Sequence, residues 1–92
     1  MPVTYLNIEW PNEETDQVYS PSSVIQDYFT PGNLLPVDKF LQITNEALTE
    51  ASERVRRKYG YACTSAQEEI RRVSLKCKDY DAINSVKIIS IK

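Results

Sequence analysis

The sequence predicts an α+β fold in which a small three-stranded sheet packs on helices. Three features predict it: alternating apolar residues near the N-terminus, a long helical apolar stripe in the middle of the chain, and a β-branched segment near the C-terminus. With 92 residues and a hydrophobic content of 41%, the chain can bury one core but not two. We therefore expect a single α+β domain over residues 1–92.

The first predicted element is an N-terminal β-hairpin. Residues 3–10 alternate between two sets of side chains, as a strand does. Residues 11–14, Pro-Asn-Glu-Glu, form a turn, and residues 15–19 return as a short second strand, so the hairpin has an acidic tip. The side chains expected to point into the core are Leu6, Ile8 and Trp10.

A short helix and a closing strand are predicted on either side of the central helices. Ser20 can cap a helix whose first position is Pro21 and which continues to about Phe29. Near the C-terminus, residues 85–91 are rich in isoleucine and valine, which is typical of a strand. We expect this strand to join the hairpin and complete the three-stranded sheet, with the helices on one face.

A long amphipathic helix from Pro36 to Tyr59 is the centre of the predicted fold. Pro36 suits the first helical position, where its missing N–H is not needed, and Gly60 suits the left-handed stop. At about 1.5 Å per residue the helix spans roughly 36 Å, so the other elements must pack along it. Its apolar stripe consists of Val37, Phe40, Leu41, Thr44, Ala47, Leu48, Ala51, Val55 and Tyr59.

A third helix is predicted after Gly60. Thr64 or Ser65 can cap its N-terminus, because a Gln or Glu follows each of them three residues later. We expect the helix to reach about Lys78, although residues 73–78 also alternate as a strand would, which leaves that alternative open. Its buried face is marked by Ala66, Ile70, Val73 and Cys77.

The net charge of −2 conceals an asymmetry along the chain. Residues 1–38 carry six acids and no base, a charge of −6, whereas residues 39–92 carry eleven bases and seven acids, a charge of +4. The ordinary explanation is complementarity within the fold or between subunits, and the functional one is a charged site that steers a partner. No apolar run approaches the roughly 20 residues of a membrane span, and no signal peptide is apparent, so we expect a cytoplasmic protein without a membrane partner.

The two cysteines are expected to be reduced thiols. Cys63 and Cys77 lie fourteen positions apart, which across a helix is on the order of 20 Å and too far for a disulfide. Cys63 precedes the third helix, where the helix dipole can activate a thiol, so a small thiol-dependent enzyme or carrier is one alternative. A buried structural thiol competes with it, since the chain has no histidine to serve as a base. No cofactor motif or metal-ligand cluster occurs, so we expect no cofactor, metal or catalytic residue.

The densest basic run lies at the C-terminal end of the long helix. With two tyrosines beside it, this run makes a nucleic-acid-binding regulator a further alternative. However, cations also stabilise a helix C-terminus, and Glu50 and Glu53 lie one turn back. Together with a pI of 5.1, this argues against a nucleic-acid partner. The candidate interaction or reactive surface consists of Arg54, Arg56, Arg57, Lys58, Tyr59, Tyr61 and Cys63.

Three segments resemble a known family. They are residues 19–29 (YSPSSVIQDYF), residues 51–60 (ASERVRRKYG) and residues 61–66 (YACTSA). The chain is similar over nearly its whole length to small bacterial proteins called nitrogen starvation response proteins, which are encoded beside a nitrilase, an acetyltransferase, a radical enzyme and a flavoprotein. No catalytic residue is established in that family, so the resemblance implies a setting in bacterial nitrogen metabolism rather than a reaction. We expect a non-catalytic accessory or interaction protein that acts with enzymes of this nitrilase gene cluster, with homo-oligomerisation as an open alternative.

Overall fold

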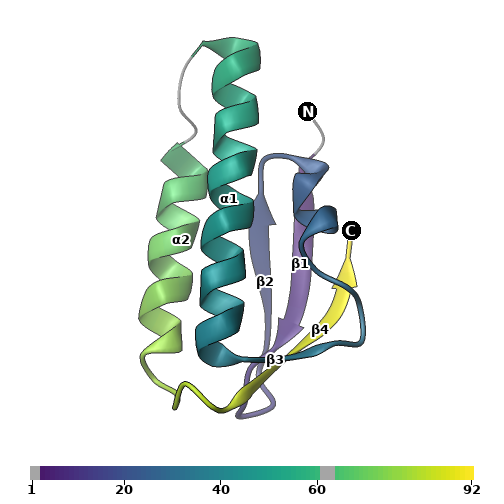
Figure 1. Ribbon diagram of the computed structural model, residues 1–92, viewed down its shortest axis with the longest axis vertical. Helices are drawn as coiled ribbons and strands as arrows, with labels where there is room; N and C mark the ends of the chain where they lie inside the picture. The colour runs from purple at the N-terminus through teal and green to yellow at the C-terminus, as the bar shows by residue number, and fades with distance from the viewer. Residues whose placement is uncertain (1–2, 61–63) are drawn as a thin grey trace.

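The computed structural model describes residues 3–60 and 64–92, which form two α-helices, one 3-10 helix and four strands (Figure 1). The predicted α+β class is confirmed, and both α-helices lie on the same side of the sheet (Figure 1). In chain order the elements are β1 (Thr4–Glu9), β2 (Thr15–Ser20), the 3-10 helix η1 (Ser23–Asp27), β3 (Leu34–Pro36), α1 (Val37–Tyr59), α2 (Thr64–Cys77) and β4 (Ser85–Ile91).

The antiparallel sheet has the strand order β2-β1-β4-β3, one strand more than the sequence predicts. The hairpin of β1 and β2 is confirmed, and so is the closing strand β4 beside β1. The additional strand β3 pairs with the start of β4, with Leu34 opposite Lys87. Main-chain bonds hold it there, from Gly32 N to Ile88 O (2.7 Å) and from Ile88 N to Asn33 O (2.9 Å). The sequence does not predict β3 because three residues ending in proline carry no alternating pattern.

The predicted short helix is a 3-10 helix that begins later and ends earlier than expected, at Ser23 and Asp27. Its N-cap is Ser22, whose hydroxyl accepts a hydrogen bond from the Val24 N–H (3.3 Å). Ser20, the predicted cap, belongs to β2, and its hydroxyl donates to the Ser22 carbonyl (2.6 Å). Since the Ser20 side chain is used in the turn out of the strand, the cap moves to the next available serine.

The two α-helices follow their predicted patterns, except that Tyr59 at the end of the apolar stripe is exposed. Pro36 is the N-cap of α1 rather than its first helical residue. Gly60 ends α1 as predicted, with φ of 82° and its N–H donating to the Arg56 carbonyl (2.8 Å). α2 continues to Cys77, so the helical prediction for residues 73–77 is confirmed and the strand alternative is wrong. Among the described residues, neither helix combines the length and the apolar character that crossing a membrane requires.

An aromatic cluster joins the helices to the sheet. Trp10, which follows β1, meets Phe40 of α1 edge to face (5.6 Å between ring centroids) and stacks on Tyr80 (5.5 Å, 11° between planes). Phe40 also contacts Phe29, which follows η1 (5.8 Å). The inward-pointing residues predicted from the alternation are all buried: Leu6, Ile8 and Trp10.

Candidate functional site

The outer face of the sheet, turned away from α1 and α2, carries the candidate site (Figure 1). Its large apolar side chains Tyr5, Leu34 and Ile89 are 41%, 63% and 41% exposed. Exposed aromatic and aliphatic side chains among polar ones are typical of protein interfaces. By strand alternation and register, the outer face includes Tyr5, Asn7, Glu9, Thr15, Gln17, Tyr19, Leu34, Pro36, Ser85, Lys87, Ile89 and Ser90.

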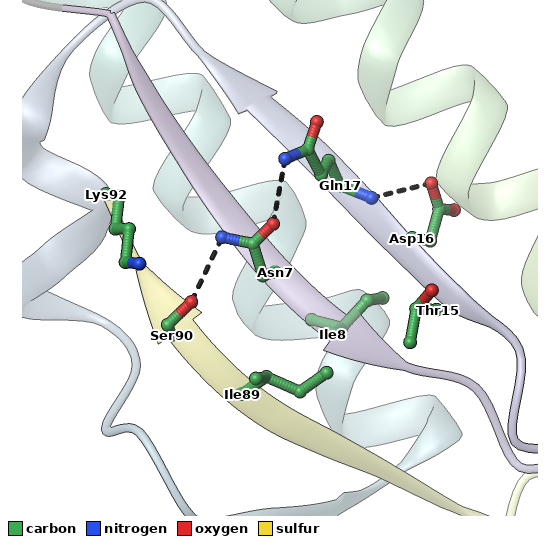
Figure 2. A pocket seen from close by; sticks show the side chains of 8 residues that line it. All are labelled: Asn7, Ile8, Thr15, Asp16, Gln17, Ile89, Ser90 and Lys92. Atoms are coloured by element: carbon green, nitrogen blue, oxygen red, sulfur yellow. Dashed lines mark hydrogen bonds between the residues drawn. The ribbon is translucent and has the colours of Figure 1, made fainter.

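A row of hydrogen-bonded side chains crosses the outer face over three strands (Figure 2). Gln17 Nε2 of β2 donates to Asn7 Oδ1 of β1 (2.9 Å), and Asn7 Nδ2 donates to Ser90 Oγ of β4 (3.1 Å). Each amide has two N–H donors and a carbonyl with two lone pairs, so the row keeps hydrogen-bonding capacity toward a partner. Because these bonds fix the side-chain positions, the row is preorganised for contact.

A β-bulge in β4 places an apolar side chain beside this row. The pairing with β1 shifts between Asn7, which is opposite Ser90, and Ile8, which is opposite Ile88, so Ile89 is the extra residue. In a regular strand, Ile89 and Ser90 would point to opposite faces. The bulge allows both to lie on the outer face, where Ser90 bonds to Asn7 and Ile89 is exposed.

A shallow hollow of about 820 Å³ lies over the row. Figure 2 looks onto it, with the helices behind the sheet and Ile89 and Lys92 on the β4 side. Enclosed, mostly apolar pockets suit small molecules, whereas this hollow is open and mixes polar and apolar groups. The lining residues are Asn7, Ile8, Thr15, Asp16, Gln17, Ile89, Ser90 and Lys92.

Two side chains of α2, Glu69 and Arg72, cover the free edge of β2. Together with Asp16 of β2, we call them the edge latch. The Arg72 guanidinium donates to the Gln17 main-chain carbonyl (2.8 Å), to Asp16 (2.9 Å) and to both oxygens of Glu69 (2.7 and 3.2 Å). Glu69 also accepts a bond from the Tyr19 N–H (2.7 Å). The Gln17 carbonyl and the Tyr19 N–H, two main-chain groups to which an added strand would bond, are therefore occupied.

The edge latch keeps the Asp16 carboxylate charged. Its Oδ2 accepts hydrogen bonds from Arg72 and from the Trp10 indole N–H (3.0 Å). Burial raises the pKa of Asp16, but these two hydrogen bonds and the charge of Arg72 outweigh burial, so its pKa lies below the ordinary value. Hydrogen bonding to Glu69 raises the pKa of Arg72.

Two ion pairs connect the acidic N-terminal third of the chain to α2. Asp16 pairs with Arg72 (2.9 Å), and Glu14 pairs with Lys76 (3.6 Å). These pairs join the two oppositely charged parts of the sequence inside one chain. They support the ordinary explanation of the charge asymmetry, complementarity within the fold.

The basic run that the sequence singles out lies away from the outer face, on the last turns of α1. Arg54 pairs with Glu50 (3.4 Å) and Arg56 with Glu53 (2.7 Å). Hydrogen bonding to Arg56 lowers the pKa of Glu53. Two of the four cations are thus paired within the helix, which reduces the charge left for phosphate contacts.

The remaining residues of the predicted basic surface fall into two groups, of which the structure describes only one. Arg57, Lys58 and Tyr59 are exposed at the end of α1, where the Lys58 ammonium lies 5.6 Å from the centroid of the Tyr59 ring. Tyr61 and Cys63 lie outside the described residues, so the reactivity of the Cys63 thiol stays a prediction. The structure does not bring this basic end of α1 together with the row on the outer face.

Cys77 is buried at the end of α2, as the sequence predicts. Burial raises the pKa of its thiol to about 11. The thiol is therefore protonated at neutral pH, which suits a packing role.

The sequence did not identify the outer-face row or the edge latch. Alternation in the first strand already places Asn7 outward, but only the strand register shows that Gln17 and Ser90 flank it. The bulge at Ile89 has no local sequence signal, and Arg72 resembles any exposed cation on a helix. One usable signal was an asparagine in the middle of a predicted strand, where asparagine is disfavoured.

Comparison with known families gives a match over most of the chain. The family model described as nitrogen starvation-induced protein NitG matches residues 5–91, which include the outer-face row and both α-helices. Comparisons with curated proteins and with solved structures give no match. The description of the family gives a condition of expression and does not specify a reaction or a partner.

Proposed function

The chain belongs to the NitG family of nitrogen starvation-induced proteins, and on this premise we propose that it is a non-catalytic interaction protein that docks on an enzyme through the outer face of its sheet. The expected partners are enzymes of the nitrilase gene cluster, which the sequence resemblance suggests. The proposal is supported mainly by one observation: the row of Gln17, Asn7 and Ser90 lies beside the bulged Ile89 on a face that α1 and α2 leave open.

The arrangement of this row has the features of a contact surface. Protein interfaces place an apolar anchor among polar groups that hydrogen-bond across to the partner. Ile89 is suited to be the anchor, and the amides of Asn7 and Gln17 are suited to be the polar groups. The closed edge of β2 supports the face as the contact, because the partner cannot extend the sheet there.

The charge of the outer face favours a protein over a nucleic acid. Glu9 and Lys87 are opposite each other in the register of β1 and β4, so they balance one another. A phosphate backbone requires several cations on one surface. This face offers hydrogen bonds and apolar area in their place, which suits a folded protein surface.

The test is binding of the purified chain to each purified cluster enzyme by isothermal titration calorimetry. Ile89→Arg places a charge at the proposed contact, and we expect it to weaken binding by roughly 100-fold. Gln17→Ala removes one end of the row without disturbing the core, and a loss of about five- to tenfold is expected for one hydrogen bond. Circular dichroism checks that both variants stay folded.

Arg57→Glu is the matched control, since it reverses an exposed charge at the basic end of α1. It should bind like the unmodified chain. The proposal fails if no cluster enzyme binds, or if Ile89→Arg binds normally. It also fails if Arg57→Glu is the variant that loses binding, because the contact would then lie at the basic end of α1.

A further inference from the structure

The turn between α2 and β4 exposes a large apolar side chain. The Asn84 N–H donates to the Asp81 carbonyl (3.0 Å), so residues 81–84 form a turn with Ile83 in its third position. Ile83 is 86% exposed, more than any other large hydrophobic residue described. Turns favour Gly, Asn, Asp, Pro and Ser, so local preference does not explain a β-branched residue here. A residue that breaks a local rule in this way points to a function.

The turn that carries Ile83 is held firmly against the helices. The Val37 N–H donates to the Asn84 carbonyl (2.8 Å), and the Asp38 N–H donates to the Ala82 carbonyl (3.4 Å). Earlier in the same loop, Tyr80 is fixed by its stacking on Trp10. Because the turn is already ordered, Ile83 can enter a contact with little loss of conformational entropy.

A small apolar hollow of about 230 Å³ lies next to this turn. It is bounded by the start of α1, the end of α2 and the same loop, with Val37, Leu41 and Cys77 among its lining residues. Dry apolar cavities of about 150 Å³ hold a benzene molecule, so this hollow has room for an aliphatic side chain.

We propose that two copies of this chain associate about a two-fold axis, with Ile83 of each copy inserted into the hollow of the other. A two-fold interface uses the same patch on both copies, so the patch must contain both the inserted group and the pocket that receives it. Here they are adjacent, since Ala82 lines the hollow and Ile83 follows it. This surface is separate from the outer face of the sheet, so the inference does not depend on the proposed function.

Charge supports a second copy as the occupant. The hollow is lined by one exposed acid, Asp38, and one exposed base, Lys78. In a two-fold contact each acid can pair with the base of the other copy. A partner carrying one sign of charge would be repelled by one of the two residues.

The first test is the mass of the purified chain by sedimentation equilibrium over a range of concentrations. We expect a reversible dimer of twice 10.6 kDa. Ile83→Asp should weaken dimerisation by roughly 100-fold or more, since a charge replaces an inserted apolar side chain in both copies. Ile89→Arg on the outer face is the matched control and should leave the dimer intact. Conversely, Ile83→Asp should keep any binding to the cluster enzymes.

The second test mixes two charge variants. Asp38→Lys and Lys78→Asp should each dimerise roughly tenfold more weakly, because each homodimer brings like charges together. Mixing the two variants should restore association, since residue 38 of each copy then faces a residue 78 of opposite charge. If Asp38 and Lys78 paired within one chain instead, mixing would not restore association.

Three outcomes would overturn the proposal. The first is a mass of one chain at every concentration, and the second is a dimer that Ile83→Asp does not weaken. The third is a loss of enzyme binding by Ile83→Asp in a chain that is monomeric, because the hollow would then receive a different protein.

Discussion

Replacing Arg72 with methionine tests whether the edge latch holds β2 to α2. Methionine keeps an unbranched side chain and removes the four hydrogen bonds that Arg72 donates to Gln17, Asp16 and Glu69. The Arg72 side chain is 42% exposed, so water screens each bond, and each contributes about 0.5 kcal/mol. The lost free energy of unfolding is therefore roughly 2 kcal/mol, which lowers Tm by about 8–16 °C for a chain of this size.

The assay is thermal unfolding followed by circular dichroism, at neutral and acidic pH. Arg71→Met, an exposed neighbour on the same helix, is the control and should change stability by less than about 0.5 kcal/mol. Because the pKa of Asp16 is lowered in the folded state, its contribution is fully present above its unfolded pKa of about 3.9 and is lost as pH falls through the folded value. The Tm difference between the unmodified chain and Arg72→Met should therefore narrow below about pH 4.

Two results would refute this account of the edge latch. If Arg72→Met and Arg71→Met melt at the same temperature, the bonds to β2 contribute nothing to stability. If the Tm difference between the unmodified chain and Arg72→Met stays constant down to about pH 2, the ion pair between Arg72 and Asp16 does not contribute to that difference. An intact latch also predicts that Arg72→Met, with the β2 edge uncovered, aggregates more readily than Arg71→Met at equal concentration.

Two further predictions concern stability. Thr44 Oγ1 is buried in α1 without a hydrogen-bond partner among the described residues, so Thr44→Val should raise the free energy of unfolding in urea by about 1 kcal/mol. Thr49→Val on the exposed side of the same helix should change the free energy of unfolding by less than about 0.5 kcal/mol. Equal changes in Thr44→Val and Thr49→Val would show that the unpaired Thr44 hydroxyl does not destabilise the fold. Glu13 has φ of 72° at the hairpin tip, a conformation that glycine adopts without steric cost. Glu13→Gly should therefore raise the free energy of unfolding by about 0.5–1 kcal/mol. Asn12→Gly, which removes the amide that bonds to Glu14, should lower it.

The parts of the fold that could be predicted have local signals. Gly60 marks the end of α1 by its own conformational freedom, and the apolar stripe marks the buried face of that helix. The strand β3 lacks such a signal, because it exists only through pairing with residues 85–87, about fifty positions later. The cap of η1 was misplaced for a related reason: Ser20 and Ser22 are equally good caps, and only the tertiary turn decides between them.

The candidate site was harder to predict than the fold because it depends on register. Asn7, Gln17 and Ser90 come from three strands, and a slip of one residue in either pairing would send a member of the row to the core face. The sequence instead indicates the basic end of α1, where Arg54, Arg56, Arg57 and Lys58 lie within five consecutive positions. Closeness in sequence shows how many cations are near one another. In the folded helix, however, Glu50 and Glu53 pair with two of the four.

The two proposed contacts can operate together because they use different parts of the molecule. The outer-face row crosses β2, β1 and β4, with the helices behind it (Figure 2), whereas the Ile83 turn and its hollow lie where α1 begins and α2 ends. A two-fold dimer through Ile83 leaves the outer face of each copy free. Its complex with a cluster enzyme that is itself a monomer should then contain two copies of each protein, and Ile83→Asp should halve the mass of that complex without changing the affinity of a single outer face. The mass of the complex and the affinity therefore report the two contacts separately.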